Sequence, residues 1–237
     1  MFIDFINRMI IKRRGAQKRK ESPNPIIDWP VNVVSQDMGC DRGTPIDRFY
    51  IEKFLTQSQK YITGNIMEIG DNAYSLKFGK NISTSYILTA DAEKCDCFES
   101  KVIHGDLQTG VGCEKDFLDC FILTQTLPFI YDVESAAKNI INMLRKDGVA
   151  LITVSGISMI SKYDDSRWGH YWGFTTTSLK RLFDKISEVK AIQIQTWGNP
   201  KTAAAFLYGL SVEDLAKTDF LVDDTLVPVM ISAIVKK

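Results

Sequence analysis

The chain has 237 residues, of which 45% are hydrophobic and 24% charged, so it is long enough to bury one substantial core. Its 29 basic and 29 acidic residues give a formal net charge of zero, which argues against a specific nucleic-acid partner. The five cysteines form no C-x-x-C pair, and no histidine stands at zinc-ligand spacing from them. We therefore expect reduced thiols in a cytoplasmic protein and no metal site. The C-x-C pair of Cys95 and Cys97 is a weak signal for a metal or redox site.

Residues 1–30 predict a basic amphipathic leader followed by a Pro-rich linker, and residues 31–237 a single domain. Within 1–20, apolar residues recur at helical spacing from Phe2 to Ile10 and are followed by six lysines and arginines. The order of charge and apolarity is not that of a signal peptide. The pattern favours peripheral contact with the inner membrane face. A subunit contact or a loosely packed leader remain as alternatives.

Short apolar runs alternate with helical patterns through the rest of the chain. Helices are expected over 46–61, over 133–144 with a turn at 146–148, over 175–186 with Thr175 or Thr176 as its cap, and over 202–208. Strands are expected over 65–69, 85–89, 101–103, 117–124, 149–154, 191–196 and 227–235. This alternation predicts a doubly wound, Rossmann-like α/β fold: a mostly parallel seven-stranded sheet, an antiparallel C-terminal strand and helices on both faces.

Polar residues follow the first four predicted strands. Ligands of such sheets bind beyond the carboxyl ends of the strands, where the strand order reverses. The residues expected at that edge are Glu68, Gly70 and Asp71, then Asp91, then Asp106 with Leu107, and finally Thr124 with Gln125.

This arrangement resembles the class I S-adenosylmethionine (SAM)-dependent methyltransferases from about Asp41 to the C-terminus. EIGD at 68–71 looks like the family's first motif, Asp91 its ribose acid, GDL at 105–107 its adenine loop and LTQTLPFIYD at 123–132 its post-strand motif. The resemblance implies SAM as cofactor, bound by the strand-end residues named above. Arg48 on the preceding helix is the candidate to clasp the methionine carboxylate or an anionic substrate.

The first motif departs from the family's Glu-x-Gly-x-Gly-x-Gly, because only Gly70 remains at the turn. Glycine-rich turns let the backbone approach a pyrophosphate. SAM carries no phosphate, so one glycine with Asp71 and Asn72 as turn-tolerant residues can suffice. The missing G-x-G-x-x-G fingerprint also disfavours a Rossmann-type oxidoreductase.

A narrower resemblance rests on CDRGTPIDRFYIEKFL at 40–55, LTQTLPFIYDVESA at 123–136 and WGHYWGF at 168–174. These segments look like a bacterial methyltransferase group found near glycosyltransferases in surface-polysaccharide gene clusters. The resemblance implies an O-methyltransferase that acts on a sugar or small-molecule hydroxyl in polysaccharide biosynthesis, with a glycosyltransferase as a candidate partner. The alternative is a non-catalytic module of the same fold that binds a glycosyltransferase or a membrane.

Methylation of a hydroxyl requires a base, and His170 is the candidate because histidine as a residue type is suited to proton transfer near neutral pH. Asp47 is the alternative base. Trp168, Tyr171 and Trp172 are candidates for an aromatic wall against a sugar face, and Tyr50 for a further pocket residue. The competing interpretations are a surface-loop histidine, a solvated helix face for Asp47 and Arg48, and core packing for Tyr50.

Overall fold

The computed structural model describes residues 29–90 and 100–237. The leader, Asp91, Cys95 and Cys97 lie outside the described residues. The chain divides into two compact units, Met1–Val33 and Val34–Lys237, and the helices and strands of the described residues all belong to the second. In the described part of the chain, no helix is long and apolar enough to span a bilayer.

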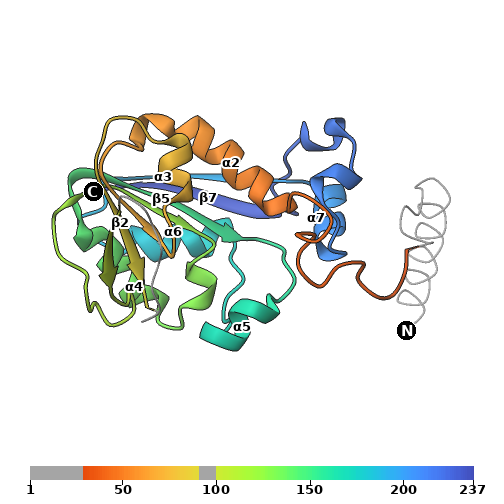
Figure 1. Ribbon diagram of the computed structural model, residues 1–237, viewed down its shortest axis with the longest axis horizontal. Coiled ribbons are helices and arrows are strands. Elements are labelled where there is room, and N and C mark those ends of the chain that lie inside the picture. The colour runs from red at the N-terminus through yellow and green to blue at the C-terminus, as the bar shows by residue number, and fades with distance from the viewer. Residues whose placement is uncertain (1–28, 91–99) are drawn as a thin grey trace, which may run out of the picture. The chain divides into compact units, whose positions relative to one another are not determined.

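A seven-stranded sheet organises the second unit (Figure 1). Its strand order is β3-β2-β1-β4-β5-β7-β6. The first five strands in this order pair in parallel, while β7 runs antiparallel to both β5 and β6. The predicted fold is therefore confirmed. The strands are β1 Gly64–Ile69, β2 Ile82–Thr89, β3 Ser100–His104, β4 Leu118–Thr124, β5 Leu144–Ser155, β6 Ala191–Trp197 and β7 Met230–Lys236.

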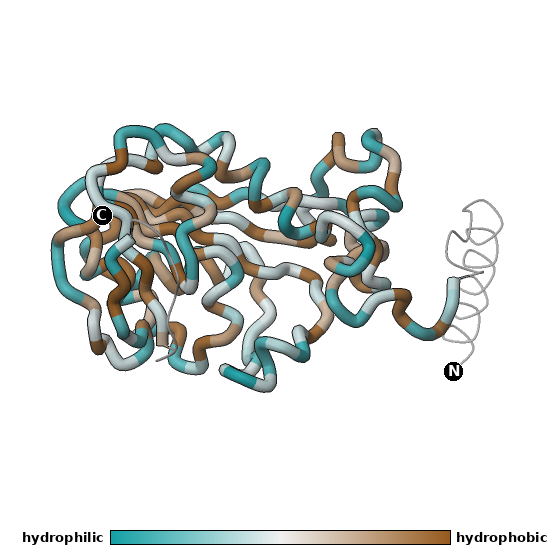
Figure 2. The backbone as a smooth tube through the Cα atoms, in the orientation of Figure 1, coloured by the Kyte–Doolittle hydropathy of each residue, from teal (hydrophilic) through white to brown (hydrophobic). Residues whose placement is uncertain are grey.

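Helices cover both faces of the sheet and close two apolar cores (Figure 1). On one face pack α4 Val133–Met143 and α6 Thr176–Asp184, and on the other pack α2 Ile46–Ser58, α3 Ala73–Phe78 and α7 Pro200–Leu207. Figure 2 shows the apolar residues gathered along the central strands. The apolar run from Cys120 to Leu123 in β4 has a simple cause, because Phe121 and Leu123 belong to the core beneath α4 and α6 while Cys120 and Ile122 belong to the core beneath α2, α3 and α7.

Several element boundaries differ from the prediction. Strand β5 begins at Leu144, directly after α4, so residues 146–148 lie in an irregular start of the strand, where Asp147 has a φ of 65°. Helix α3 and the short helix α5, Lys162–Trp168, were not predicted. The predicted cap of α6 is confirmed, because the Thr175 hydroxyl accepts from the backbone N–H of Ser178.

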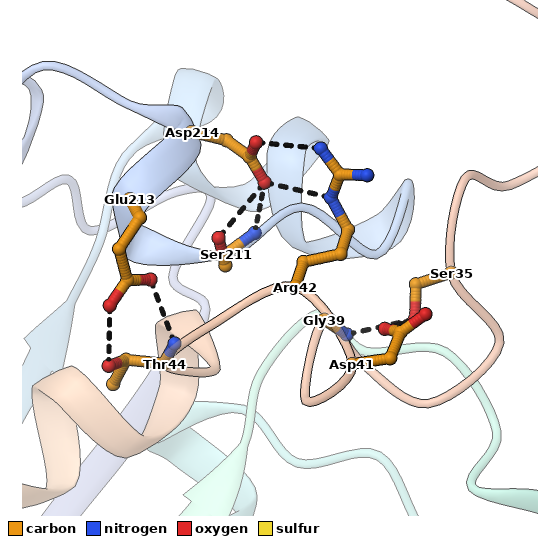
Figure 3. A network of polar contacts seen from close by, with 8 residues as sticks. All are labelled: Ser35, Gly39, Asp41, Arg42, Thr44, Ser211, Glu213 and Asp214. Atoms are coloured by element: carbon orange, nitrogen blue, oxygen red, sulfur yellow. Dashed lines mark hydrogen bonds and ion pairs between the residues drawn. The ribbon is translucent and has the colours of Figure 1, made fainter.

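A polar clamp joins the segment before α2 to the segment after α7 (Figure 3). The Arg42 guanidinium contacts both carboxylate oxygens of Asp214, at 2.9 Å from Nε and 2.7 Å from Nη2. Thr44 donates to Glu213 through its backbone N–H and its hydroxyl, both at 2.8 Å. The clamp therefore fixes the chain immediately ahead of the first turn of α2.

Candidate functional site

A cavity of about 760 Å³ lies at the carboxyl ends of the first four strands. Strand order reverses between β1 and β4, so the cavity occupies the position where open α/β sheets bind ligands. Its volume falls in the range of small-molecule sites. Among the predicted residues, those that line it are Gly70, Asp106, Leu107, Thr124, Gln125, Trp168 and Tyr171.

The turn after β1 is closed by side chains rather than by a string of glycines. Gly70 has a φ of 79°, and a Cβ placed there would meet no atom within 4 Å, so this glycine faces open space. The Asp71 carboxylate accepts from the N–H of Ala73 at 2.9 Å, and Asn72 Nδ2 donates to Ser100 Oγ at 2.8 Å. The exposed Asp71 is not among the lining residues.

Glu68 lies beneath this turn and not in the cavity. Its side chain is 3% exposed and accepts from the backbone N–H of Tyr74 at 3.2 Å and of Ser75 at 2.6 Å, as well as from the Ser75 hydroxyl. Burial raises the pKa of Glu68 to about 7, although these hydrogen bonds oppose the shift. Glu68 therefore anchors the first turn of α3, and its position gives no support to the predicted contact with a cofactor.

The loop after β3 holds Asp106 at the cavity wall. The Asp106 carboxylate accepts from the N–H of Gln108 at 2.7 Å, and its own N–H donates to the carbonyl of Val111 at 2.9 Å. Asn139 of α4 donates to the carbonyl of Leu107 at 2.8 Å. The loop is thus fixed from two sides, which presents a carboxylate and a buried leucine to the same cavity.

A second cavity of about 110 Å³, here called the inner chamber, brings together the two candidate bases, Asp47 and His170. Gln125, Phe129 and Asp164 line both the inner chamber and the larger cavity. The further residues of the inner chamber are Met38, Pro128, Ser155, Ser158, Phe206 and Val229.

Burial raises the pKa of the half-buried Asp47 carboxyl, which accepts from the N–H of Arg48 at 2.7 Å. The His170 ring packs edge-on against Phe129, with 5.0 Å between ring centroids. Its backbone N–H donates to Asp165 at 2.9 Å, while Nδ1 is buried and has no hydrogen-bond partner among the described residues. The two candidate bases therefore share one chamber beside the larger cavity, in a setting suited to proton transfer.

Aromatic side chains border the larger cavity. Trp168 is 39% exposed and Tyr171 47% exposed, and both line the cavity together with Tyr131. The rings of Tyr131 and Tyr171 pack edge to face at 5.3 Å. Trp172 packs against Tyr131 but does not line the cavity, and its indole N–H donates to the carbonyl of Ile130 at 3.0 Å. This aromatic rim consists of Tyr131, Trp168 and Tyr171.

Two other predicted residues lie away from both cavities. Tyr50 is fully buried in the core beneath α2, and its hydroxyl donates to Thr202 at 3.3 Å. Arg48 is exposed and lines neither cavity. The structure therefore favours core packing for Tyr50 and a solvated position for Arg48.

Sequence reasoning missed Phe129, Tyr131 and Asp164. Asp164 belongs to α5, whose N-cap residue Ser161 accepts from the N–H of Asp164. A serine three residues before an aspartate is a helix-start signal and could have identified this helix.

No protein-family model matches the sequence, and no curated protein sequence matches it either. Solved structures do. A SAM-dependent methyltransferase from Archaeoglobus fulgidus superimposes with a TM-score of 0.53 at 12% identity, over 81% of this chain and 94% of that one. A SAM-dependent methyltransferase from Thermotoga maritima gives 0.55 at 16% identity, over 81% and 91%. The chain has the fold of SAM-dependent methyltransferases.

A third similar structure contains a cofactor product. The N-methyltransferase NodS from Bradyrhizobium japonicum, solved with S-adenosylhomocysteine, gives a TM-score of 0.51 at 12% identity, over 86% of this chain and 92% of that one. The residues present in this chain fit such a ligand. Gly70 opens onto the cavity without a side chain, Asp106 supplies a carboxylate, and Ile69, Leu88 and Leu107 supply apolar walls.

Proposed function

We propose that this protein is a SAM-dependent O-methyltransferase that acts on a hydroxyl of a sugar or another small molecule. One observation carries the proposal: the cavity at the carboxyl ends of β1 to β4 adjoins an inner chamber that holds Asp47 and His170, with Gln125 lining both. A cofactor space and a pair of titratable groups thus lie side by side, as methyl transfer to oxygen requires.

The larger cavity is the proposed cofactor site. When bound, SAM supplies a methyl group on an electrophilic sulfonium. Asp106 would accept hydrogen bonds from the adenosyl part, Gly70 would leave room for the rest of the ligand, and Leu107 would supply an apolar surface. Asp91 remains the residue predicted from the sequence to bind the ribose hydroxyls of SAM.

In this proposal, a base in the inner chamber removes the proton of the acceptor hydroxyl. His170 is the proposed base because neutral imidazole accepts a proton near neutral pH. Asp47, whose carboxyl is held by the first turn of α2, is the alternative base. The aromatic rim supplies flat apolar faces at the cavity's edge, which suit the face of a sugar ring.

The cellular setting is proposed from the sequence patterns. The resemblance of segments 40–55, 123–136 and 168–174 to methyltransferases near glycosyltransferases supports a role in surface-polysaccharide biosynthesis, with a glycosyltransferase partner. The apolar stripe and basic run of residues 1–20 support a cytoplasmic protein held at the inner membrane face.

A second candidate is a non-catalytic module that retains the fold. The observation in its favour is the turn after β1, where Gly70 is the only glycine of the expected motif. Such a module would bind a glycosyltransferase or a membrane without turning over SAM.

Calorimetric titration with SAM and S-adenosylhomocysteine separates the two candidates. We expect binding by the wild-type chain and by Asp184→Ala, a control on the exposed side of α6, and weaker binding by Asp106→Ala. If the titration shows no heat of binding at millimolar SAM, only the non-catalytic module remains as a candidate. Mass spectrometry of a sugar panel incubated with SAM then tests methyl transfer, and a panel in which only amines gain a methyl would refute the O-methyltransferase.

A further inference from the structure

We propose that the inner chamber is a binding site for an uncharged, hydroxyl-bearing end of the acceptor. This inference rests on the proposed function, since the hydroxyl would lie beside the cofactor cavity. Its physical basis, however, is a set of unpaired polar atoms in the inner chamber, which any bound ligand must satisfy.

Gln125 is the central residue of the inner chamber. Its φ of 50° lies in the left-handed region, which disfavours residues other than glycine. Its backbone N–H donates to the carbonyl and the hydroxyl of Thr153 in β5, at 2.9 and 3.2 Å. This contact locks the strained backbone where the side chain borders both cavities. Strain of this kind collects at functional positions.

Two buried polar atoms in this chamber lack a partner. They are Gln125 Nε2 and His170 Nδ1, the only such side-chain atoms found in the described residues. Buried polar groups in folded proteins are nearly always hydrogen-bonded, because an unmade bond is costly. That both exceptions line one chamber indicates that a bound group supplies their partners.

The remaining lining identifies the chemistry of that group. A carboxylate could accept from Gln125 Nε2 but would face the carboxyl groups of Asp47 and Asp164. An ammonium, which has only donors, could pair with those carboxyl groups but would leave Gln125 Nε2 without an acceptor. A hydroxyl both accepts and donates, so it can satisfy Gln125 and one of the aspartates at once. Ser155 and Ser158 add hydroxyls of the same dual character.

Size sets how much of the acceptor enters. A chamber of about 110 Å³ holds several water-sized groups but no complete hexose. The rest of the acceptor would therefore extend past Phe129 and Asp164, which line both cavities, toward the aromatic rim. The chamber thus selects one end of the acceptor by hydrogen bonding, while the rim contacts the rest.

Ligand-observed NMR with three small probes tests the chamber directly. Ethylene glycol, acetate and methylammonium are compared by saturation transfer at equal concentrations, with and without S-adenosylhomocysteine. The proteins are the wild type, Gln125→Leu and a matched control, Gln193→Leu, on the exposed face of β6. We expect glycol binding in the wild type and the control, and a loss of about fivefold or more in Gln125→Leu.

If Gln125→Leu fails to fold by circular dichroism, His170→Phe decides, since it keeps an aromatic ring of similar size and removes Nδ1. Equal glycol signals in wild type and variant, or stronger binding of acetate or methylammonium than of glycol, overturn the proposal. The cofactor question is answered separately: if S-adenosylhomocysteine does not bind, the proposed function fails, while the glycol comparison without it still decides the chamber.

Discussion

Replacement of Glu68 by glutamine should change how the stability of the protein depends on pH. Glu68 is buried and its pKa is raised to about 7. A carboxyl whose folded-state pKa exceeds its unfolded value favours the folded state below the unfolded pKa. That contribution is lost as pH rises through the folded pKa. The wild type should therefore lose stability between about pH 5 and about pH 8 through this residue.

The size of the effect follows from the shift. With an unfolded pKa of 4.5 and a folded pKa of about 7, linkage predicts a loss of about 2.5 kcal/mol in the free energy of unfolding over this interval. Glu68→Gln cannot ionise, so its stability relative to wild type should rise by that amount. The absolute stability of the variant should still be lower at acid pH, because the glutamine amide nitrogen cannot accept from the N–H groups of Tyr74 and Ser75.

Urea denaturation at four pH values, followed by circular dichroism, measures this difference. Glu114→Gln, an exposed glutamate outside the cavities, serves as the control and should track the wild type. Parallel pH profiles for wild type and Glu68→Gln would refute the reasoning. SAM affinity of the folded variant should change little, because Glu68 does not line the cavity.

Three further predictions concern the site and the leader. Asp106→Ala should weaken SAM binding by about 1.5 to 3 kcal/mol in calorimetry, through lost charge-assisted hydrogen bonds, and an affinity equal to that of Asp184→Ala would remove Asp106 from the site. His170→Ala should lower turnover about a hundredfold with unchanged SAM affinity, so undiminished turnover in a methyl-transfer assay would exclude it as the base. Deletion of residues 1–20 should abolish co-sedimentation with anionic vesicles while neutral vesicles bind neither protein; sedimentation of the truncated chain would contradict the membrane role.

The fold was readable from the sequence because its strongest signals are burial signals. Residues 120–123 form an unbroken apolar run because they face two cores, and α4 and α6 present regular apolar stripes to one of these cores. The antiparallel final strand followed from the long excursion before it. Short elements such as α3 and α5 carry too few residues for a periodic pattern, and tertiary contacts define them instead.

The site was only partly readable. A sequence motif indicates which residues end a strand but not the direction in which each side chain points. Glu68 binds the first turn of α3, whereas Gly70 opens onto the cavity. The inner chamber draws on segments around Asp47, Gln125, Ser158 and His170. No local sequence pattern indicates that these segments, which are far apart in the chain, lie together in the fold.

The segment CDRGTPID acquires a physical role from the same geometry. Asp47 can face the inner chamber only if the first turn of α2 is held in place, yet Pro45 at its N-terminal end provides no side-chain hydrogen bond as a cap. The clamp of Arg42 and Thr44 on Asp214 and Glu213 supplies that restraint from outside the helix. Because the clamp residues line neither cavity, they act as positioning residues. Within this segment, Asp47 therefore lies in the inner chamber, while Arg42 and Thr44 support its position indirectly.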